Sequence, residues 1–214
     1  MDLIPQKYAK TQNLTMKIIG LVGGIGSGKS IVARLIGKHE GVTVIDADQL
    51  GHEVLRLDEV KTLVKAQWGD APFGDDDEIN RRKMAELVFS DTENSNENLE
   101  QLNKISHPRI TELLKKHLET AKISDVRMVL IDAPLLIEGG WDRFCDEIIF
   151  VDSPLPARIA RVLERGWTPE EFQVRTANQL PLDKKRQTAR IVIENDCSLV
   201  ELEQRVDSVM RQIF

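Results

Sequence analysis

The chain has 214 residues, of which 41% are hydrophobic and 30% are charged, and its formal net charge at pH 7 is -6. This length and composition are typical of one folded domain with a substantial core, and they exclude an intrinsically disordered chain. The negative net charge argues against broad binding to nucleic acid, which needs a positive surface.

The first predicted elements form a β-strand, helix, β-strand unit. Residues 17–22 are a β-branched run that predicts a buried strand followed by a glycine-rich loop. A helix is expected to begin near Lys29 and to end near Glu40-Gly41, because glycine suits a helix C-terminus. A second strand is expected over residues 42–46. Such a unit has parallel strands, and it predicts a three-layer α/β fold.

The middle of the chain, approximately residues 58–121, has apolar residues at helical spacing. We expect this stretch to be an inserted helical subdomain. Strand-like runs return after it, so the sheet is expected to be parallel and five-stranded. The further strands are expected over residues 126–131, 148–151 and 191–193, with helices near 155–165 and 170–178 and an amphipathic helix over 199–210.

Residues 1–15 are interpreted as an N-terminal extension of a single domain over residues 16–214. Cys145 and Cys197 belong to no Cys-x-x-Cys pattern, which argues against a zinc site or a disulfide framework. No apolar run approaches the length of a membrane span, and the start of the chain does not resemble a signal peptide. We expect a cytoplasmic protein with no membrane association and no obligate protein partner.

Residues 23–30 match the phosphate-binding pattern G-x-x-x-x-G-K-[ST], and they lie between a predicted strand and a predicted helix, as this loop requires. Glycines let the backbone curl around phosphate oxygens, and the helix N-terminus attracts anions. Lys29 is expected to neutralise the β- and γ-phosphates of a nucleotide, and the Ser30 hydroxyl to bind Mg²⁺. The sequence therefore predicts an ATP site.

Among phosphate-handling proteins, a small-molecule kinase fits best. A regulatory GTPase needs an N-K-x-D element, and the nearest match, residues 103–106, ends in Ser106. Transport and motor ATPases of this class are usually longer. A nucleoside or nucleotide kinase and a regulatory nucleotide-binding protein remain as alternatives.

Acidic residues follow two of the predicted strands, at the edge where open α/β sheets bind ligands. Asp48 is predicted to be the base that takes a proton from the acceptor hydroxyl, while Asp46 is either a ligand-binding residue or a helix cap. Asp132 follows the third strand, where it could hold Mg²⁺ indirectly or cap the next segment.

Basic residues suggest where phosphate groups are held. Arg158, Arg161 and Arg165 fall on one helix face, and Arg161 and Arg165 are candidates to close over the transferring phosphoryl group. An ordinary solvated face is the alternative. In the insert, Arg81, His107 and Arg109 could face an acceptor that carries its own phosphates, or they could be caps and surface residues. We list them as candidate substrate-binding residues.

Four separated segments together resemble the dephospho-CoA kinase family, over essentially the whole chain from Met16. They are residues 21–30, residues 44–48, His107-Pro108 and residues 132–138, the last similar to the family's D-x-P-L-L-x-E pattern. Asn195 also matches an asparagine that follows the fifth strand in this family. The chain differs at Ile31, where threonine is common, at His52, where many members have arginine, and at Arg190, where aspartate is expected.

The resemblance implies that the chain uses ATP and Mg²⁺ to phosphorylate the ribose 3′-hydroxyl of dephospho-CoA, the last step of coenzyme A biosynthesis. It also implies that Asp48 is the base, that approximately residues 153–180 form a lid, and that the insert binds the acceptor. The nucleotide-binding residues would be Gly24, Gly26, Ser27, Gly28, Lys29, Ser30, Ile31 and Asn195. The acceptor would contact Asp48, His52, Arg81, His107, Arg109 and Asp132, and the metal would contact Ser30 and Asp132.

Overall fold

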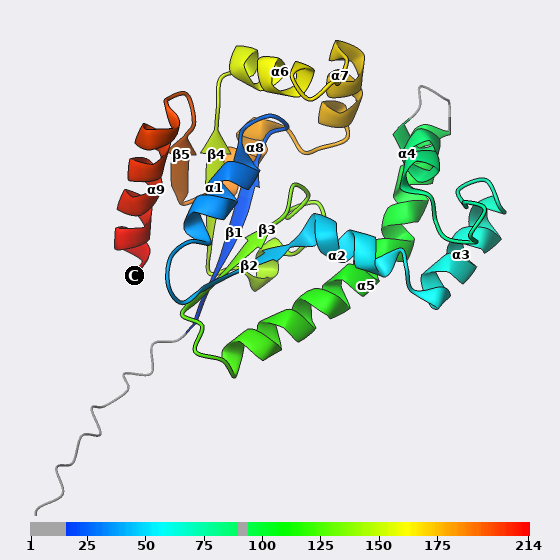
Figure 1. The fold of residues 1–214 in the computed structure, drawn as a ribbon, viewed down its shortest axis with the longest axis horizontal. Helices are drawn as coiled ribbons and strands as arrows, with labels where there is room; N and C mark the ends of the chain where they lie inside the picture. The colour runs from blue at the N-terminus through cyan, green and yellow to red at the C-terminus, as the bar shows by residue number, and fades with distance from the viewer. Residues whose placement is uncertain (1–15, 90–93) are drawn as a thin grey trace, which may run out of the picture.

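The computed structural model describes residues 16–89 and 94–214 of the chain. The expected extension over residues 1–15 lies outside this range. Five parallel strands form one sheet in the order β2-β3-β1-β4-β5, which confirms the predicted fold class (Figure 1). The strands are β1 (Lys17–Gly23), β2 (Val42–Asp46), β3 (Met128–Asp132), β4 (Glu147–Asp152) and β5 (Ile191–Glu194).

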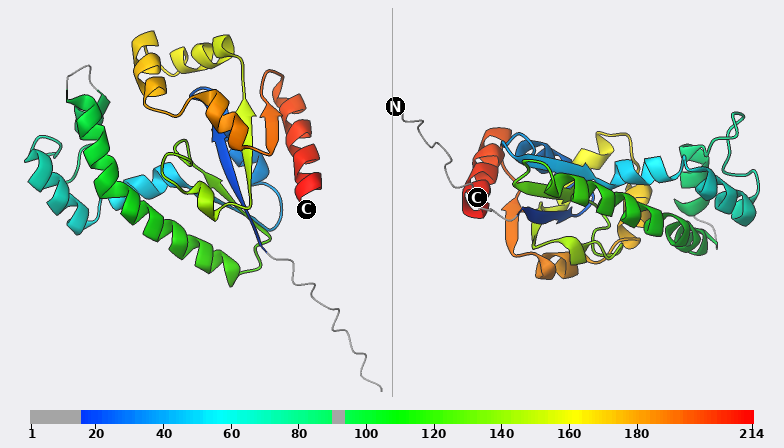
Figure 2. Two further views of the ribbon diagram at one scale, coloured as in Figure 1. Left: turned by 180° about the vertical axis from the view of Figure 1, so that it is seen from behind. Right: turned by 90° about the horizontal axis from the view of Figure 1, so that it is seen from below.

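Helices cover both faces of the sheet and extend beyond it (Figures 1 and 2). Ile19 and Leu21 of β1 pack toward α1 and α9, whereas Val22 packs toward the C-terminal half of α5 and the segment after β3. This alternation produces the expected three layers. The helices are α1 (Lys29–Ile36), α2 (Ala47–Val54), α3 (Asp58–Trp68), α4 (Arg81–Phe89), α5 (Ser95–Lys122), α6 (Leu155–Leu163), α7 (Pro169–Ala177), α8 (Leu182–Thr188) and α9 (Leu199–Ile213), and η1 (Asp142–Phe144) is a short 3-10 turn.

The predicted insert consists of α3, α4 and part of α5, which project to one side of the sheet (Figure 1). Helix α5 belongs to two parts of the molecule at once. Leu114 and Leu118, in its C-terminal half, pack in the same core cluster as Ile45 and Val129 of the sheet. The N-terminal half packs against α4, so one continuous helix connects the insert rigidly to the core.

The expected lid, residues 153–180, contains α6 and α7, which lie beyond the edge where the strands end (Figure 1). Within the described residues, no helix is both long and apolar enough to cross a membrane.

One predicted boundary is wrong. Helix α1 ends at Ile36 rather than near Glu40-Gly41, and the amide of Gly37 closes its last turn by donating to Ala33 O. Gly41 instead occupies a left-handed turn, with φ of 77°, directly before β2. Gly41 therefore forms the turn before β2 and does not end α1.

Candidate active site

The phosphate-binding loop connects β1 to α1, and its glycines are required by its packing. Gly26 and Gly28 have φ values of 77° and 87°, a conformation that other residues rarely adopt. A Cβ atom at Gly28 would also collide with the side-chain amide of Asn195. The first amides of α1 have no intrahelical acceptor, so the loop and the helix end together form an anion site. The Ser27 hydroxyl is buried there and has no hydrogen-bond partner within residues 16–89 and 94–214.

Two arginines and one asparagine support this loop from behind. Arg158 is 4% exposed, and its Nε donates to Ile25 O at 2.8 Å. Arg161 Nη1 donates to Gly26 O at 3.1 Å, and Asn195 Nδ2 donates to Ser27 O at 2.7 Å. Arg161 was expected to close over the transferring phosphoryl group, and Asn195 to contact the nucleotide. In the structure both side chains bind loop carbonyls, and neither residue lines the cavity.

Lys29, Asp132 and Asp48 form the charged centre of the site. Lys29 Nζ donates to Asp132 Oδ1 in a largely buried ion pair. Burial raises the pKa of Asp132, while Lys29 opposes this shift. The pKa of Asp48 is also raised, first by burial and then by the negative charges of Asp46 and Asp132, with Lys29 opposing. Asp48 opens into the cavity, but the surrounding protein still limits the solvation of its charge.

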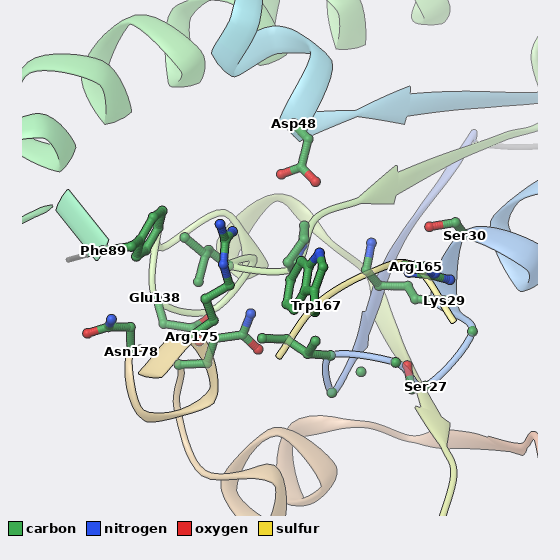
Figure 3. Close-up of a pocket in the computed structure, with 18 of the residues that line it drawn as sticks. Ser27, Lys29, Ser30, Asp48, Phe89, Glu138, Arg165, Trp167, Arg175 and Asn178 are labelled. Atoms are coloured by element: carbon green, nitrogen blue, oxygen red, sulfur yellow. The ribbon is translucent and has the colours of Figure 1, made fainter. Parts of the chain in front are cut away.

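The two aspartates at the start of α2 have different positions. Asp46 Oδ1 accepts hydrogen bonds from the amides of Asp48 and Gln49 at 2.9 and 3.1 Å, so Asp46 is the helix cap. This cap turns the chain such that the Asp48 side chain points into the cavity (Figure 3). Strand register places Asp46 beside Asp132, which explains why their charges interact.

A cavity of about 440 Å³ begins at this centre and extends toward the insert and the α6–α7 segment. Figure 3 shows Ser27, Lys29 and Ser30 toward one end, Phe89, Glu138 and Asn178 toward the other, and Asp48 between these two groups. The lining residues are Gly23, Gly24, Ile25, Gly26, Ser27, Gly28, Lys29, Ser30, Asp48, Phe89, Leu99, Asn103, His107, Pro134, Leu135, Glu138, Arg165, Trp167, Arg175, Asn178 and Gln179.

Several residues predicted from the sequence do not line this cavity: Ile31, His52, Arg81, Arg109 and Asp132. The Asp132 carboxylate pairs with Lys29 instead. Ile31, the third residue of α1, is partly buried and packs against the core cluster that α1, α9 and the sheet share. Arg81 lies exposed at the start of α4, and Arg109 pairs with Glu59 at 3.3 Å.

His107 does line the cavity, with its ring 5.3 Å from that of Trp141. Burial lowers the pKa of His107, and the charge of Glu138 opposes this shift. Its imidazole is therefore best suited to neutral hydrogen bonding at pH 7.

Glu138 and Lys185 form a buried pair that spacing did not predict. Lys185 is fully buried and donates to Pro134 O at 2.7 Å, and its Nζ lies 2.9 Å from Glu138 Oε1. Glu138 Oε1 also accepts the amide of Leu180, whereas Glu138 Oε2 is buried with no hydrogen-bond partner among the described residues.

The wall of the cavity that contains two aromatic residues was also not predicted from the sequence. Phe89, Trp167 and Arg175 come from three separate segments, and each alone has the pattern of an ordinary core or surface residue. A usable signal did exist, because Trp167 and Arg175 lie within the expected lid.

Among the described residues, no group of three or more His, Cys, Asp and Glu side chains is arranged to hold a metal ion.

Comparison with known proteins identifies the relatives of this chain. The family model described as dephospho-CoA kinase matches residues 17–201. The chain is 36% identical to a dephospho-CoA kinase from Dehalococcoides mccartyi, with 92% of this chain and 98% of that protein covered. It is 37% identical to a dephospho-CoA kinase from Deinococcus radiodurans, with 91% of each covered. The crystal structure of TT1252 from Thermus thermophilus is similar, with a TM-score of 0.76 and 34% identity over 93% of this chain and 98% of that one.

Proposed function

The chain belongs to the dephospho-CoA kinase family, which phosphorylates dephospho-CoA with ATP in the last step of coenzyme A biosynthesis, and we propose that it does so in the cavity between the phosphate-binding loop and the insert. One observation carries the assignment of this site. Lys29 and the loop that binds phosphate face the same cavity as Asp48, so a donor and an acceptor can meet there.

ATP binds with its phosphates in the loop. The unpaired helix amides and the partnerless Ser27 hydroxyl supply donors for the phosphate oxygens. Lys29 pairs with Asp132 in the structure. When ATP is bound, the Lys29 ammonium group also interacts with the γ-phosphate and stabilises the negative charge that develops during transfer. Arg165 lines the cavity from the expected lid and can contribute a second positive charge.

Asp48 acts as the base toward the ribose 3′-hydroxyl. As the hydroxyl oxygen forms its bond to the γ-phosphorus, the bond from that phosphorus to the β–γ bridging oxygen breaks, and ADP leaves. The hydroxyl proton passes to the Asp48 carboxylate. A raised pKa makes this carboxylate a stronger base than an ordinary aspartate.

The residues present fit a magnesium ion of the kind that P-loop enzymes bind. Such an ion is held by one or two protein groups and by phosphate oxygens, so it needs no cluster of protein carboxylates. The Ser30 hydroxyl lines the cavity and would bind it directly, and Asp132 would bind it through water. When bound, the ion neutralises the charge of the phosphate groups.

We also propose that the enzyme acts in the cytoplasm. Cys145 and Cys197 are both free thiols, as is typical of proteins in a reducing compartment.

The test is Mg²⁺-dependent ADP release with dephospho-CoA, adenosine, AMP or CMP as the acceptor, followed by mass spectrometry and NMR of the product. Release with dephospho-CoA and a new phosphate on the 3′-oxygen is the expected result. Preferred release with AMP or CMP would instead assign a nucleotide kinase, and release without any acceptor would assign a hydrolase.

A further inference from the structure

Arg175 is held between two aromatic rings at the end of the cavity away from the phosphate-binding loop. The centre of its guanidinium group lies 4.7 Å from the Phe89 ring and 4.6 Å from the Trp167 ring. Phe89 ends α4 of the insert, whereas Trp167 and Arg175 belong to the expected lid. Stacking between a guanidinium and aromatic rings fixes the plane of the cation and leaves its N–H edges free.

The Arg175 cation is not paired with an acidic side chain in the part of the chain that the structure describes. Within residues 16–89 and 94–214, the Arg175 side chain forms no hydrogen bond or ion pair. Arg158 and Arg161, which lie in the same part of the chain, instead donate hydrogen bonds to carbonyl oxygens of the phosphate-binding loop. Arg175 lines the cavity with its hydrogen-bonding capacity unused, as expected of a group that binds an anionic ligand.

The position of Arg175 separates it from the transferred phosphoryl group. Figure 3 shows Arg175 with Phe89, Glu138 and Asn178 on one side of Trp167, and Lys29, Ser30 and Ser27 on the other. An anion at Arg175 is therefore distinct from the γ-phosphate that Lys29 faces. An acceptor with its reacting hydroxyl at Asp48 and a second charged group farther along would reach both ends of the cavity.

We propose that Arg175, oriented by Phe89 and Trp167, binds the 5′-diphosphate of the acceptor and so positions the ribose hydroxyl at Asp48. This inference rests on the proposed function, because dephospho-CoA carries such a diphosphate on the same ribose that is phosphorylated. Since the rings come from the insert and from the lid segment, binding of the diphosphate also joins these two parts over the acceptor.

Two substitutions separate the charge of Arg175 from its flat shape. Arg175→Gln keeps a planar group and removes the charge, whereas Arg175→Lys keeps the charge and removes the planar group. Arg175→Gln is expected to raise the KM for dephospho-CoA by about 10- to 100-fold, the range for losing a charge-assisted hydrogen bond, and to leave the KM for ATP unchanged. Arg175→Lys is expected to recover part of the loss.

The matched control is Arg82→Gln, an exposed arginine of α4 that pairs with Glu86 at 3.6 Å and lies outside the cavity. Both KM values should stay unchanged in this variant. A higher KM for ATP in Arg175→Gln would assign the residue to the donor and overturn the proposal. A wild-type KM for dephospho-CoA in Arg175→Gln together with a raised KM in Arg175→Lys would also overturn it. So would a lower melting temperature with both KM values unchanged.

The wild-type enzyme separates this inference from the proposed function. If wild type does not phosphorylate dephospho-CoA, the proposed function fails before Arg175 is tested. If wild type is active and the variants behave like Arg82→Gln, only the role of Arg175 fails.

Discussion

Asp48→Asn is the substitution that tests the proposed chemistry most directly. Asparagine has nearly the same shape but cannot take a proton from the acceptor hydroxyl. A positioned base contributes about 10²–10⁴-fold to the rate, which corresponds to about 2.7–5.4 kcal/mol of transition-state stabilisation. We expect kcat to fall by this amount while the KM for ATP stays near its wild-type value.

The structure indicates that this substitution preserves the fold. The cap of α2 uses the backbone amide of Asp48 and the side chain of Asp46, and neither changes in Asp48→Asn. The raised pKa of Asp48 means that its ionised form is less favourable in the folded protein than in the unfolded chain. The contribution of Asp48 to the free energy of unfolding of wild type therefore falls as the pH rises through the folded-state pKa. The melting temperature of Asp48→Asn should be no lower than that of wild type at pH 7.5. The difference between the two melting temperatures should become smaller at acidic pH.

Steady-state ADP release across a pH series provides the assay. Wild type needs the ionised carboxylate, so kcat/KM should fall as the pH drops through a pKa above the usual value for aspartate, and Asp48→Asn should lack this limb. Asp46→Asn is the matched control. Asparagine keeps the cap, and loss of the Asp46 charge should move the limb to lower pH. Wild-type turnover in Asp48→Asn, or an unchanged acid limb, would refute the assignment of the base.

Three further predictions follow from other parts of the site. Lys29→Met should destabilise the protein by about 3–5 kcal/mol in urea unfolding, because Asp132 would remain buried and unpaired, and adding Asp132→Asn should restore part of this loss; additive effects would contradict the pairing. Arg161→Ala should raise the KM for ATP and lower the melting temperature, because it removes hydrogen bonds to backbone carbonyls. Arg165→Ala should lower kcat without changing the melting temperature, because Arg165 lines the cavity. Equal changes in melting temperature in the two variants would contradict this difference in roles. Burial raises the pKa of the Cys145 thiol to about 12, so iodoacetamide at pH 8 should leave Cys145 unmodified in the folded protein and alkylate it in guanidinium, as read by peptide mass spectrometry.

The features that the sequence predicted best are those that depend on neighbouring residues. β2 has the predicted bounds, and β1 begins at the predicted residue, because each strand is a short run rich in β-branched residues next to a turn signal. Helix α8 was missed since its residues, Leu182–Thr188, are mostly polar. Its Lys185 is nevertheless fully buried, because Glu138 and Pro134 O lie opposite. Only the tertiary partner reveals that this lysine is an interior residue.

The candidate site divides along the same line. Lys29, Ser30 and Asp48 follow strands that end at one edge of the sheet, so their convergence could be expected from topology alone. Phe89 and Glu138 reach the cavity from the insert and from the segment after β3, and no spacing rule relates these segments. Their approach depends on how α5 positions the insert relative to the core, which is set by packing rather than by a local pattern.

The arginines explain how a chain with a net charge of -6 can bind polyphosphates. The spacing of Arg158 and Arg161 indicated a shared helix face, but not which surface that face contacts. In the structure it contacts the carbonyl oxygens behind the phosphate-binding loop. A cation at the carbonyl end of a peptide group favours the orientation in which the N–H end points away from it, toward the cavity. Lys29 acts on phosphate from the front and these two arginines from behind, so a local positive field forms without a basic surface.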